Sequence, residues 1–277
     1  MVSSISCPNF GAAYLRRNFV AISNNIPGPV ESGTDVASAR GIVNSLRDLT
    51  VQTVSELYVK YQDDLCAVRD QQRTFLRQRG RSMKAQLDDY EAEITYLLLR
   101  EYRPETVVEI GTFYGWSTMW ILSALRDNGV GHLYSFDIVD HVVSNVPADL
   151  SAHRWTFTKG DVRETLGDIP GSADYLFIDA DHGARFGRWY VENVFPMVRP
   201  GTPTSVHDVF HGRRPKPISE GSVLMKWLVA QNKSFFTPSA AKAPEVIEHL
   251  SKVKKELRLD TPVRESRHNP MVFFTLG

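Results

Sequence analysis

Acidic residues and histidines follow two segments that have the pattern of neighbouring buried strands. Residues 174–179 end in Asp179, with His182 three positions later, and residues 202–207 lead directly into Asp208. If these strands are adjacent in a parallel sheet, their carboxyl ends lie about 5 Å apart. Asp179 and Asp208 can then share a divalent cation such as Mg²⁺, which prefers oxygen ligands, orients a substrate oxygen and lowers its pKa.

Two further histidines lie beside the second acid. His207 is a candidate third ligand, and an imidazole ligand would favour a softer metal than Mg²⁺. Strand alternation points His207 and Asp208 to opposite faces unless the strand has already ended. His211 is a spare ligand or base, or simply a loop histidine. The alternative to a metal site is that the two acids bind the substrate or have structural roles.

The stretch that ends in Asp181 and His182 also contains a candidate base. A neutral imidazole at the start of a helix can remove a hydroxyl proton near neutral pH, which is the role we expect for His182. Asp181 is more plausibly the cap of that helix. The alternative is that His182 has no catalytic role and is a polar residue at the start of the helix.

A glycine-containing turn follows an earlier strand. The apolar run ends in Glu109 and Gly111, a second glycine follows at Gly115, and a helical pattern begins at once. Glycine permits backbone conformations and close ligand approach that a Cβ would obstruct. This pattern predicts a parallel strand that turns tightly into a helix, with Glu109 near the edge where such sheets bind ligands.

Two more acids end predicted strands. Asp137 follows residues 132–136 and can accept hydrogen bonds from both hydroxyls of a ribose, or it can cap the next turn. If the strand ends later than expected, Asp140 takes the place of Asp137 as the acid that contacts the ribose. Asp161 either caps the helix predicted at 161–167 or contacts a ligand.

Strands that alternate with helices must position these residues. The strands are expected at 106–110, 132–137, 154–158, 174–179 and 202–207, and the helices at 116–126, 161–167, 184–197 and 219–231. This alternation predicts an α/β fold with a doubly wound, mostly parallel sheet. Residues 234–237 are a candidate sixth strand, residues 271–276 a final one, and 244–257 a charged helix.

The segment from Glu109 to Ser117 resembles motif I of the class I S-adenosylmethionine-dependent methyltransferases, which reads E/D-x-G-x-x-x-G. The stretch Phe177-Ile-Asp-Ala-Asp-His182 resembles one found in bacterial O-methyltransferases of small molecules. The resemblance covers roughly residues 83–276. A dinucleotide site, the competing interpretation, normally requires G-x-G-x-x-G, a spacing that this loop lacks.

The resemblance implies a Rossmann-like sheet of seven strands closed by an antiparallel hairpin, and methyl transfer to a hydroxyl oxygen, with a secondary metabolite as the expected acceptor. It assigns Asp137 to the ribose of S-adenosylmethionine and Asp161 to the adenine amino group. The implied cofactor-binding residues are Glu109, Gly111, Tyr114, Gly115, Trp116, Ser117, Asp137, Ile138, Asp161, Val162 and Asp179. The expected catalytic residues are His182 and Asp179, and the expected metal ligands are Asp179, Asp208 and His207.

The chain departs from the cation-dependent members of this family in one place. They usually carry Asn or Asp directly after the second acid, where this chain has Val209, and others carry an acid before it, where this chain has His207. Two rival functions stay open because a fold does not fix its chemistry. A non-methylating enzyme, such as a cyclase or hydroxylase-like relative, would form no S-adenosylhomocysteine. A catalytically silent binding protein would have no affinity for the cofactor.

Composition limits the partners. Lys and Arg together number 32, as do Asp and Glu, so the 277-residue chain is formally neutral and gives no sign of a nucleic-acid or membrane surface. Hydrophobic residues make up 42%, enough for a sizeable core. The start lacks the pattern of a signal peptide, and Cys7 and Cys66 lack metal-ligand spacing. We expect a cytoplasmic enzyme with a small-molecule substrate.

The region before the sheet is expected to be helical. Residues 1–34 are predicted to be an irregular arm, followed by helices at 45–61, 65–79 and 83–102. We divide the chain into an N-terminal arm with helices (1–82) and a methyltransferase domain (83–277). The N-terminal part is expected to be a substrate lid or the surface of a homodimer or higher homo-oligomer.

Overall fold

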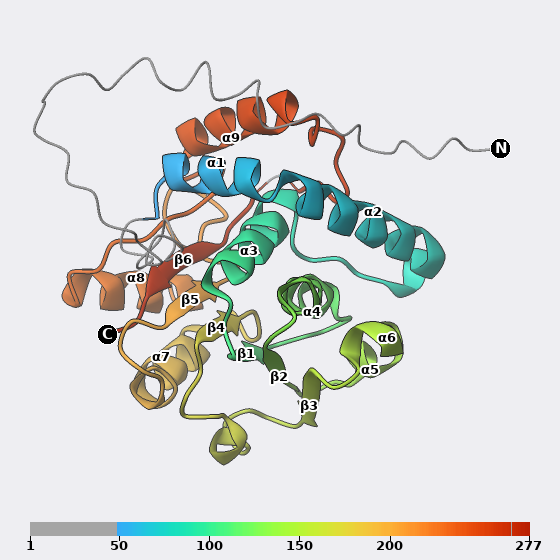
Figure 1. Ribbon diagram of the computed structural model, residues 1–277. Coiled ribbons are helices and arrows are strands. Elements are labelled where there is room, and N and C mark those ends of the chain that lie inside the picture. The colour runs from blue at the N-terminus through green and yellow to red at the C-terminus, as the bar shows by residue number, and fades with distance from the viewer. Residues whose placement is uncertain (1–48, 267) are drawn as a thin grey trace, which may run out of the picture. The chain divides into compact units, whose positions relative to one another are not determined.

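Six strands form a single sheet in the computed structural model, which describes residues 49–266 and 268–277 (Figure 1). Their order is β3-β2-β1-β4-β5-β6, and only β6 runs antiparallel to its neighbour. The strands are β1 (Thr106–Ile110), β2 (His132–Asp137), β3 (Trp155–Lys159), β4 (Tyr175–Ile178), β5 (Pro203–Val206) and β6 (Val272–Thr275). The α/β class, the parallel strands and the antiparallel last strand are thereby confirmed.

The sheet has one strand fewer than predicted. Residues 234–237 contribute only an isolated antiparallel bridge, between Phe236 and Phe273. Phe236 exchanges both backbone hydrogen bonds with Phe273, at 2.8 and 2.9 Å. Pro238 follows almost at once and has no N–H to donate, so the pairing does not extend into a strand.

Helices cover both faces of the sheet. In Figure 1, α3 and α4 lie on one side, and α7 and α8, which contact each other, lie on the other. Right-handed crossovers require this arrangement, because the chain moves from β1 toward β2 in one direction and from β4 toward β5 in the other. The helices are α1 (Val51–Lys60), α2 (Gln62–Arg79), α3 (Asp89–Tyr102), α4 (Trp116–Asn128), α5 (His141–Asn145), α6 (Ala148–Ser151), α7 (Ala184–Asn193), α8 (Glu220–Ala230) and α9 (Pro244–Glu256).

Helix α3 begins six residues later than predicted. Asp88 and Glu91 form a capping box, in which the Asp88 side chain accepts from the Glu91 amide and the Glu91 side chain accepts from the Asp88 amide. This reciprocal pairing satisfies amides that have no partner inside the helix and fixes its first turn. Residues 83–88 therefore approach the sheet as irregular backbone.

The helix predicted at 161–167 does not form. Asp161 instead closes a turn, in which its carbonyl accepts from the amides of Glu164 and Thr165, and only a short 3-10 turn, Leu166–Asp168, follows. The Asp161 side chain also accepts from the Arg163 amide at 2.9 Å, a local bond that favours a turn over a helix. Similarly, α7 ends at Asn193, and Pro196 lies in a separate 3-10 turn, Phe195–Met197.

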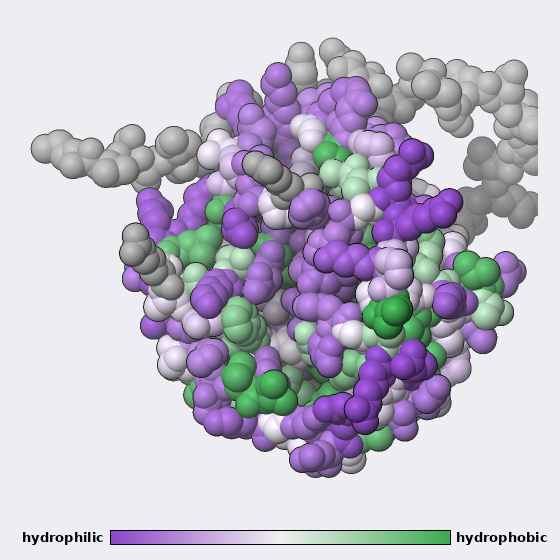
Figure 2. Space-filling model, turned by 180° about the vertical axis from the view of Figure 1, so that it is seen from behind, coloured by the Kyte–Doolittle hydropathy of each residue, from purple (hydrophilic) through white to green (hydrophobic). Residues whose placement is uncertain are grey.

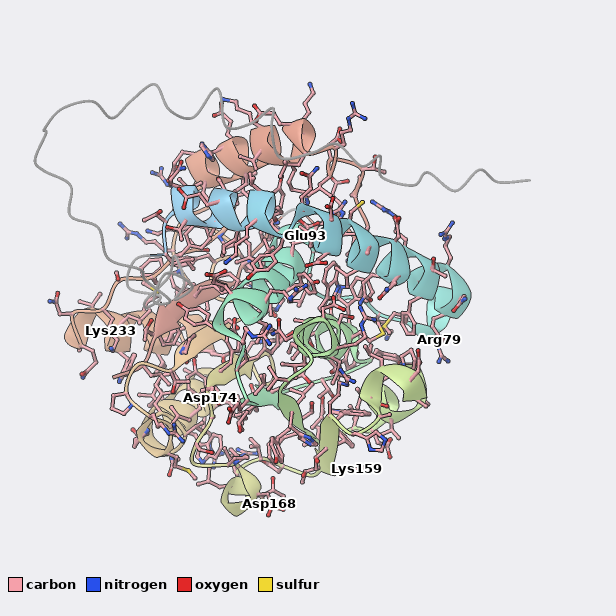
Figure 3. All side chains as sticks on the ribbon, in the orientation of Figure 1. Arg79, Glu93, Lys159, Asp168, Asp174 and Lys233 are labelled. Carbon is pink, nitrogen blue, oxygen red and sulfur yellow. The ribbon has the colours of Figure 1, made fainter. Side chains whose placement is uncertain are left out.

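The helices before the sheet are tied to the rest of the molecule by buried charges. Glu93 of α3, labelled in Figure 3, accepts from the Tyr58 hydroxyl at 2.7 Å and pairs with Lys254 at 2.8 Å and with Arg69. These groups belong to α1, α9 and α2, so four helices meet at one carboxylate. The described residues from position 49 onward belong to one compact unit. The predicted arm at 1–34 lies outside the described residues.

The molecular surface carries no broad apolar face on the side shown in Figure 2, where hydrophobic residues form small patches among hydrophilic ones. In the described part of the chain, the large hydrophobic side chains that are exposed come from Val59, Ile138, Val143, Ile218 and Val229. No helix in that part is long and apolar enough to cross a bilayer.

Candidate active site

A cavity of about 620 Å³ opens at the carboxyl ends of the parallel strands. Residues that follow β1, β2, β3, β4 and β5 all contribute to its wall. This is the edge at which open α/β sheets bind ligands. The lining side chains include Asp137, Ile138, Asp161, Val162, Asp179, His182, His207, Asp208 and His211.

The loop after β1 is shaped by Gly111. Its φ is +91°, and a Cβ at this position would lie 1.9 Å from the backbone oxygen of Asp179. Any other residue would therefore push apart the ends of β1 and β4. Gly115 is constrained in a similar way, because its φ is +90° and a Cβ would lie 2.9 Å from Val142 Cγ2.

Asp137 binds this loop from the end of β2. Its Oδ2 accepts from the amides of Thr112 and Phe113, both at 2.7 Å, and from the Thr112 hydroxyl at 3.1 Å. Its Oδ1 accepts from the Val139 amide at 3.1 Å. A carboxylate oxygen has two lone pairs, so Oδ1 keeps one acceptor position that faces the cavity.

Glu109 does not line the cavity, although it was expected to hold the cofactor. It is fully buried, and the hydroxyls of Ser117, Thr118 and Ser135 donate to its carboxylate at 2.6, 2.9 and 2.7 Å. Burial raises the pKa of Glu109 to about 7, although these hydrogen bonds oppose the shift. Its place beneath the loop makes it a support for the turn.

The other expected cofactor residues divide into two groups. Ile138 and Val162 line the cavity, and Ile138 is 69% exposed there. Asp161 also lines it and pairs with Arg163, which lowers the pKa of the carboxyl. Tyr114, Trp116 and Ser117 instead border a small recess beside the loop, together with Lys84 and Gln86. Trp116 is buried, and its Nε1 donates to the Leu87 carbonyl at 3.0 Å.

The opposite end of the cavity brings two acids and a histidine together. One ligand atom from each of Asp179, His182 and Asp208 lies within 4.8 Å of the others. His182 Nε2 lies 2.9 Å from Asp208 Oδ2. The adjacent strand ends of β4 and β5 thus place the two acids together as predicted, while the histidine that completes this group is His182.

His207 lies beside this group and contacts both of its acids, with Nδ1 3.5 Å from Asp208 Oδ1. It is buried, with Nδ1 3.1 Å from Asp179 Oδ1 and Nε2 3.4 Å from Glu91 Oε2. Between Asp179 and Glu91, the ring supports an acid of the site. The three converging ligand atoms thus include one from His182, and the expected ligand His207 lies next to them, so the set of Asp179, Asp208 and His207 stays a prediction.

Backbone geometry explains how His207 and Asp208 both face inward. Strand β5 ends at Val206, and Asp208 has a φ of +56°, an uncommon conformation for a residue other than glycine. The strict alternation of a strand does not hold beyond its end. Such strain at a non-glycine residue is maintained by its surroundings and is often found at functional sites.

The imidazoles around Asp208 differ in protonation. Hydrogen bonds with Asp208 and with Glu220 raise the pKa of His182 to about 10. This pKa favours the protonated imidazole at neutral pH, whereas the base expected at His182 requires the neutral form. Burial lowers the pKa of His211, whose Nε2 lies 2.9 Å from Asp208 Oδ1. His211 is thus a neutral imidazole facing the cavity.

Several lining residues lie outside the expected catalytic, cofactor-binding and metal-binding sets. Gln86, Ser266, His268 and Pro270 come from the segments that precede α3 and β6. These segments are joined because Ser266 and Asn269 both donate to Asp88. Glu220, at the start of α8, lies 3.5 Å from His182 Nδ1 and is buried. The one sequence signal near these residues is the capping-box spacing of Asp88 and Glu91, which marks the start of α3.

Comparison with known proteins agrees with this geometry. Residues 108–209 match the family model described as a methyltransferase domain. No protein of curated function matches the sequence.

Solved structures share the fold at low sequence identity. A putative O-methyltransferase from Klebsiella pneumoniae is 17% identical, with a TM-score of 0.52 over 74% of this chain and 88% of that one. An O-methyltransferase from Bacillus cereus, in complex with SAH, is 14% identical, with a TM-score of 0.51 over 82% and 96%. A putative caffeoyl-CoA O-methyltransferase from Staphylococcus aureus is 13% identical, with a TM-score of 0.53 over 79% and 100%. The chain therefore has the class I methyltransferase fold, and its residues 108–209 are similar to a methyltransferase domain.

Proposed function

We propose that the protein transfers a methyl group from S-adenosylmethionine to a hydroxyl oxygen of a small molecule. The observation that carries the proposal is one continuous cavity, in which Asp137 and Ile138 line one end and Asp179, His182 and Asp208 line the other. The names of the similar structures, which are O-methyltransferases, support the same reaction.

The cofactor end fits a nucleoside. Asp137 Oδ1 offers an acceptor for a ribose hydroxyl, and the glycine loop keeps the backbone clear for close approach. Ile138 presents an exposed apolar side chain that a purine ring would cover. Val162 and Asp161 lie on the same wall, so they are suited to contact the base. S-adenosylmethionine bound here supplies a methyl group on a sulfonium, which is already a good leaving group.

The other end fits a divalent cation. Two carboxylates and an imidazole are a common donor set for Mn²⁺, Co²⁺, Zn²⁺ or Mg²⁺, and they converge here without a lysine or arginine among them. A cation held by Asp179, His182 and Asp208 supplies charge that orients the substrate oxygen and lowers its pKa. His207 and Glu91 would keep Asp179 in place.

We assign the removal of the proton to His211. His182 is engaged by Asp208 and Glu220, and as a metal ligand it would have no free lone pair. His211 lines the cavity, is neutral because burial lowers its pKa, and lies on the other side of Asp208. A neutral imidazole in this position can accept a hydroxyl proton and pass it to solvent.

The acceptor side is enclosed by residues far from the strand ends. Gln86, Ser266, His268 and Pro270 line this part of the cavity, and the bonds of Asp88 hold their two segments together. They would orient the acceptor and exclude water, which in-line transfer requires. Their polar groups favour an acceptor with several oxygens, such as a secondary metabolite.

We also propose that residues 1–82 serve the methyltransferase domain of residues 83–277 as a lid or as a homodimer surface. The packing of α1 and α2 against α3 and α9 supports a close association with that domain. The formal neutrality of the chain favours a small-molecule substrate over a nucleic-acid or membrane partner. We also propose a cytoplasmic location.

The test combines binding with product analysis. The purified protein is titrated with S-adenosylmethionine by calorimetry and then incubated with the cofactor, Mn²⁺ or Mg²⁺ and a panel of polyhydroxylated small molecules. We expect binding and the formation of S-adenosylhomocysteine with a methylated acceptor, detected by mass spectrometry. Binding with a converted acceptor that carries no added methyl group would point to a cyclase or hydroxylase-like enzyme. The absence of any cofactor binding would overturn the proposal.

A further inference from the structure

Glu220 is a buried acid outside the predicted site whose carboxylate lies behind His182. Its Oε2 is 3.5 Å from His182 Nδ1, while His182 Nε2 lies 2.9 Å from Asp208 on the other side of the ring. The Glu220 side chain is 3% exposed and that of His182 is 48% exposed. The imidazole therefore has one nitrogen toward the acids of the cavity and the other toward a carboxylate from α8.

Backbone contacts fix the position of Glu220 on two sides. Its amide donates to the His182 carbonyl at 2.9 Å, and a backbone bridge joins the next pair outward, Gly183 and Ser219. On the other side, a Cβ at Gly221 would lie 3.0 Å from Val209 Cα, in the segment that follows Asp208. The start of α8 is thus attached to the residues that flank both His182 and Asp208.

Close helix packing brings this carboxylate to the site. A Cβ at Gly187 of α7 would lie 3.1 Å from Glu220 Cα, so α7 and α8 approach each other at a glycine. Beside this contact lies the buried Tyr190 hydroxyl, and burial together with the Glu220 carboxylate raises the pKa of Tyr190.

We propose that Glu220 is a positioning residue, which orients His182 so that Nε2 serves as a ligand to a first-row divalent metal. The inference rests on the cation site of the proposed function and deepens it. A carboxylate behind a ligating histidine fixes the ring orientation and raises its basicity as a ligand. The same nitrogen ligand makes Mn²⁺ or Co²⁺ a better occupant than Mg²⁺, which prefers oxygen.

The test is metal binding by calorimetry, with metal-free full-length protein and MnCl₂ or MgCl₂ alone. Glu220→Gln should weaken Mn²⁺ binding by about 10–100-fold, the usual effect of removing such a partner. The loss for Mg²⁺ should be smaller, because the nitrogen ligand contributes less to its binding. Glu192→Gln, the same change on the exposed side of α7, is the matched control and should bind both ions as the wild type does.

A double-mutant cycle separates positioning from a general structural role. In a His182→Ala background, Glu220→Gln should cause no further loss of Mn²⁺ affinity, because the ring that it orients is gone. Should Glu220→Gln prevent folding, Glu220→Asp keeps the charge but withdraws the carboxylate, and it should show the same selective loss of Mn²⁺ affinity.

Two outcomes would overturn the inference, and they differ in what else they overturn. If the wild type binds Mn²⁺ and folded Glu220→Gln binds it equally well, or if the loss persists without His182, Glu220 does not position the ligand, but the cation site stands. If the wild type binds neither ion, the cation part of the proposed function fails as well.

Discussion

At the cofactor end of the cavity, backbone amides and one hydroxyl bind the carboxylate of Asp137, whereas at the ion end carboxylates and imidazoles neutralise one another. Asp137 has four donors, three of them backbone amides, at 2.7–3.1 Å. Asp208 has His182 and His211 at 2.9 Å and His207 at 3.5 Å. The first arrangement is fixed by the fold, and the second depends on where protons lie.

This difference assigns different work to the two ends. Backbone amides do not titrate near neutral pH, so the donors that bind Asp137 keep their hydrogens across that range. The protons on imidazoles can be replaced by a cation, because metal binding releases protons from its ligands. One end therefore holds a ligand in place and the other can change its charge during a reaction.

The largest effect is expected from Asp208→Asn, which removes the charge shared by the imidazoles. Turnover with an acceptor found in the screen should fall by about 10³-fold or more, since a bound cation contributes several kcal/mol to the reaction. The affinity for S-adenosylmethionine should stay within about twofold of wild type if the two ends are independent.

Asp181→Asn is the matched control for the loss of an acid near the cavity. The Asp181 side chain accepts from the Gly183 amide at 2.7 Å and is not one of the three converging ligands. Its variant should lose much less turnover. An equal loss in both variants would mean that the charge of the whole region matters more than the three ligands.

The next effect concerns the proton and distinguishes two histidines. His211→Ala should lower the single-turnover rate by about 10²–10⁴-fold, the usual contribution of a positioned base. Since burial lowers the pKa of His211, the wild-type rate should fall only below about pH 6.5, and this acid limb should disappear in the variant. His182→Ala should also lower the rate, but higher Mn²⁺ concentrations should restore it. A His211 variant with the wild-type rate and pH profile would return the role of base to His182.

A smaller effect is expected at the cofactor end. Asp137→Ala should weaken S-adenosylmethionine binding by about 1–3 kcal/mol, because ribose hydroxyls lose a charged acceptor and the loop loses its anchor. Mn²⁺ affinity should not change. Asp140→Ala is the control, because Asp140 is exposed and pairs with Lys159 at 2.8 Å. Undiminished cofactor binding by the Asp137 variant would remove this residue from the site.

The sequence was sufficient for the sheet because each parallel strand is a buried apolar run with a turn signal at its end. Residues 106–110 and 132–137 were predicted without error. From that sheet, the closeness of Asp179 and Asp208 followed directly, since parallel strands end at one edge. Two local errors came from turn chemistry, at Asp161 and at Pro238, where side-chain bonding and a missing amide outweighed propensity.

The side chains that complete the site could not be predicted, for a different reason. His207 and Asp208 both face inward because of a left-handed backbone at Asp208, which no pattern in the residues demands. Gln86 and Ser266 enter the cavity only because Asp88 joins two segments about 180 residues apart. Glu220 reaches His182 through helix packing at Gly187. Tertiary contacts of this kind are not encoded in local spacing.

The last predicted effect concerns stability, and it tests whether Glu109, which lies beneath the cofactor loop, titrates near neutral pH. Burial raises the pKa of Glu109 to about 7, compared with about 4.5 in the unfolded chain. The folded state therefore binds more protons than the unfolded state between these values, and the stability contributed by Glu109 is full below pH 4.5 and lost as pH rises through 7.

Glu109→Gln cannot titrate, so the unfolding free energy of the wild type relative to this variant should decrease by about 3 kcal/mol between pH 4.5 and 8. Urea unfolding of both proteins across this range measures the difference, with Glu105→Gln, at the exposed entry to the same strand, as a control that should stay within about 0.5 kcal/mol of wild type at neutral pH. A difference that does not change with pH would mean that the three hydroxyls keep Glu109 ionised throughout, and that a fixed charge lies beneath the cofactor loop.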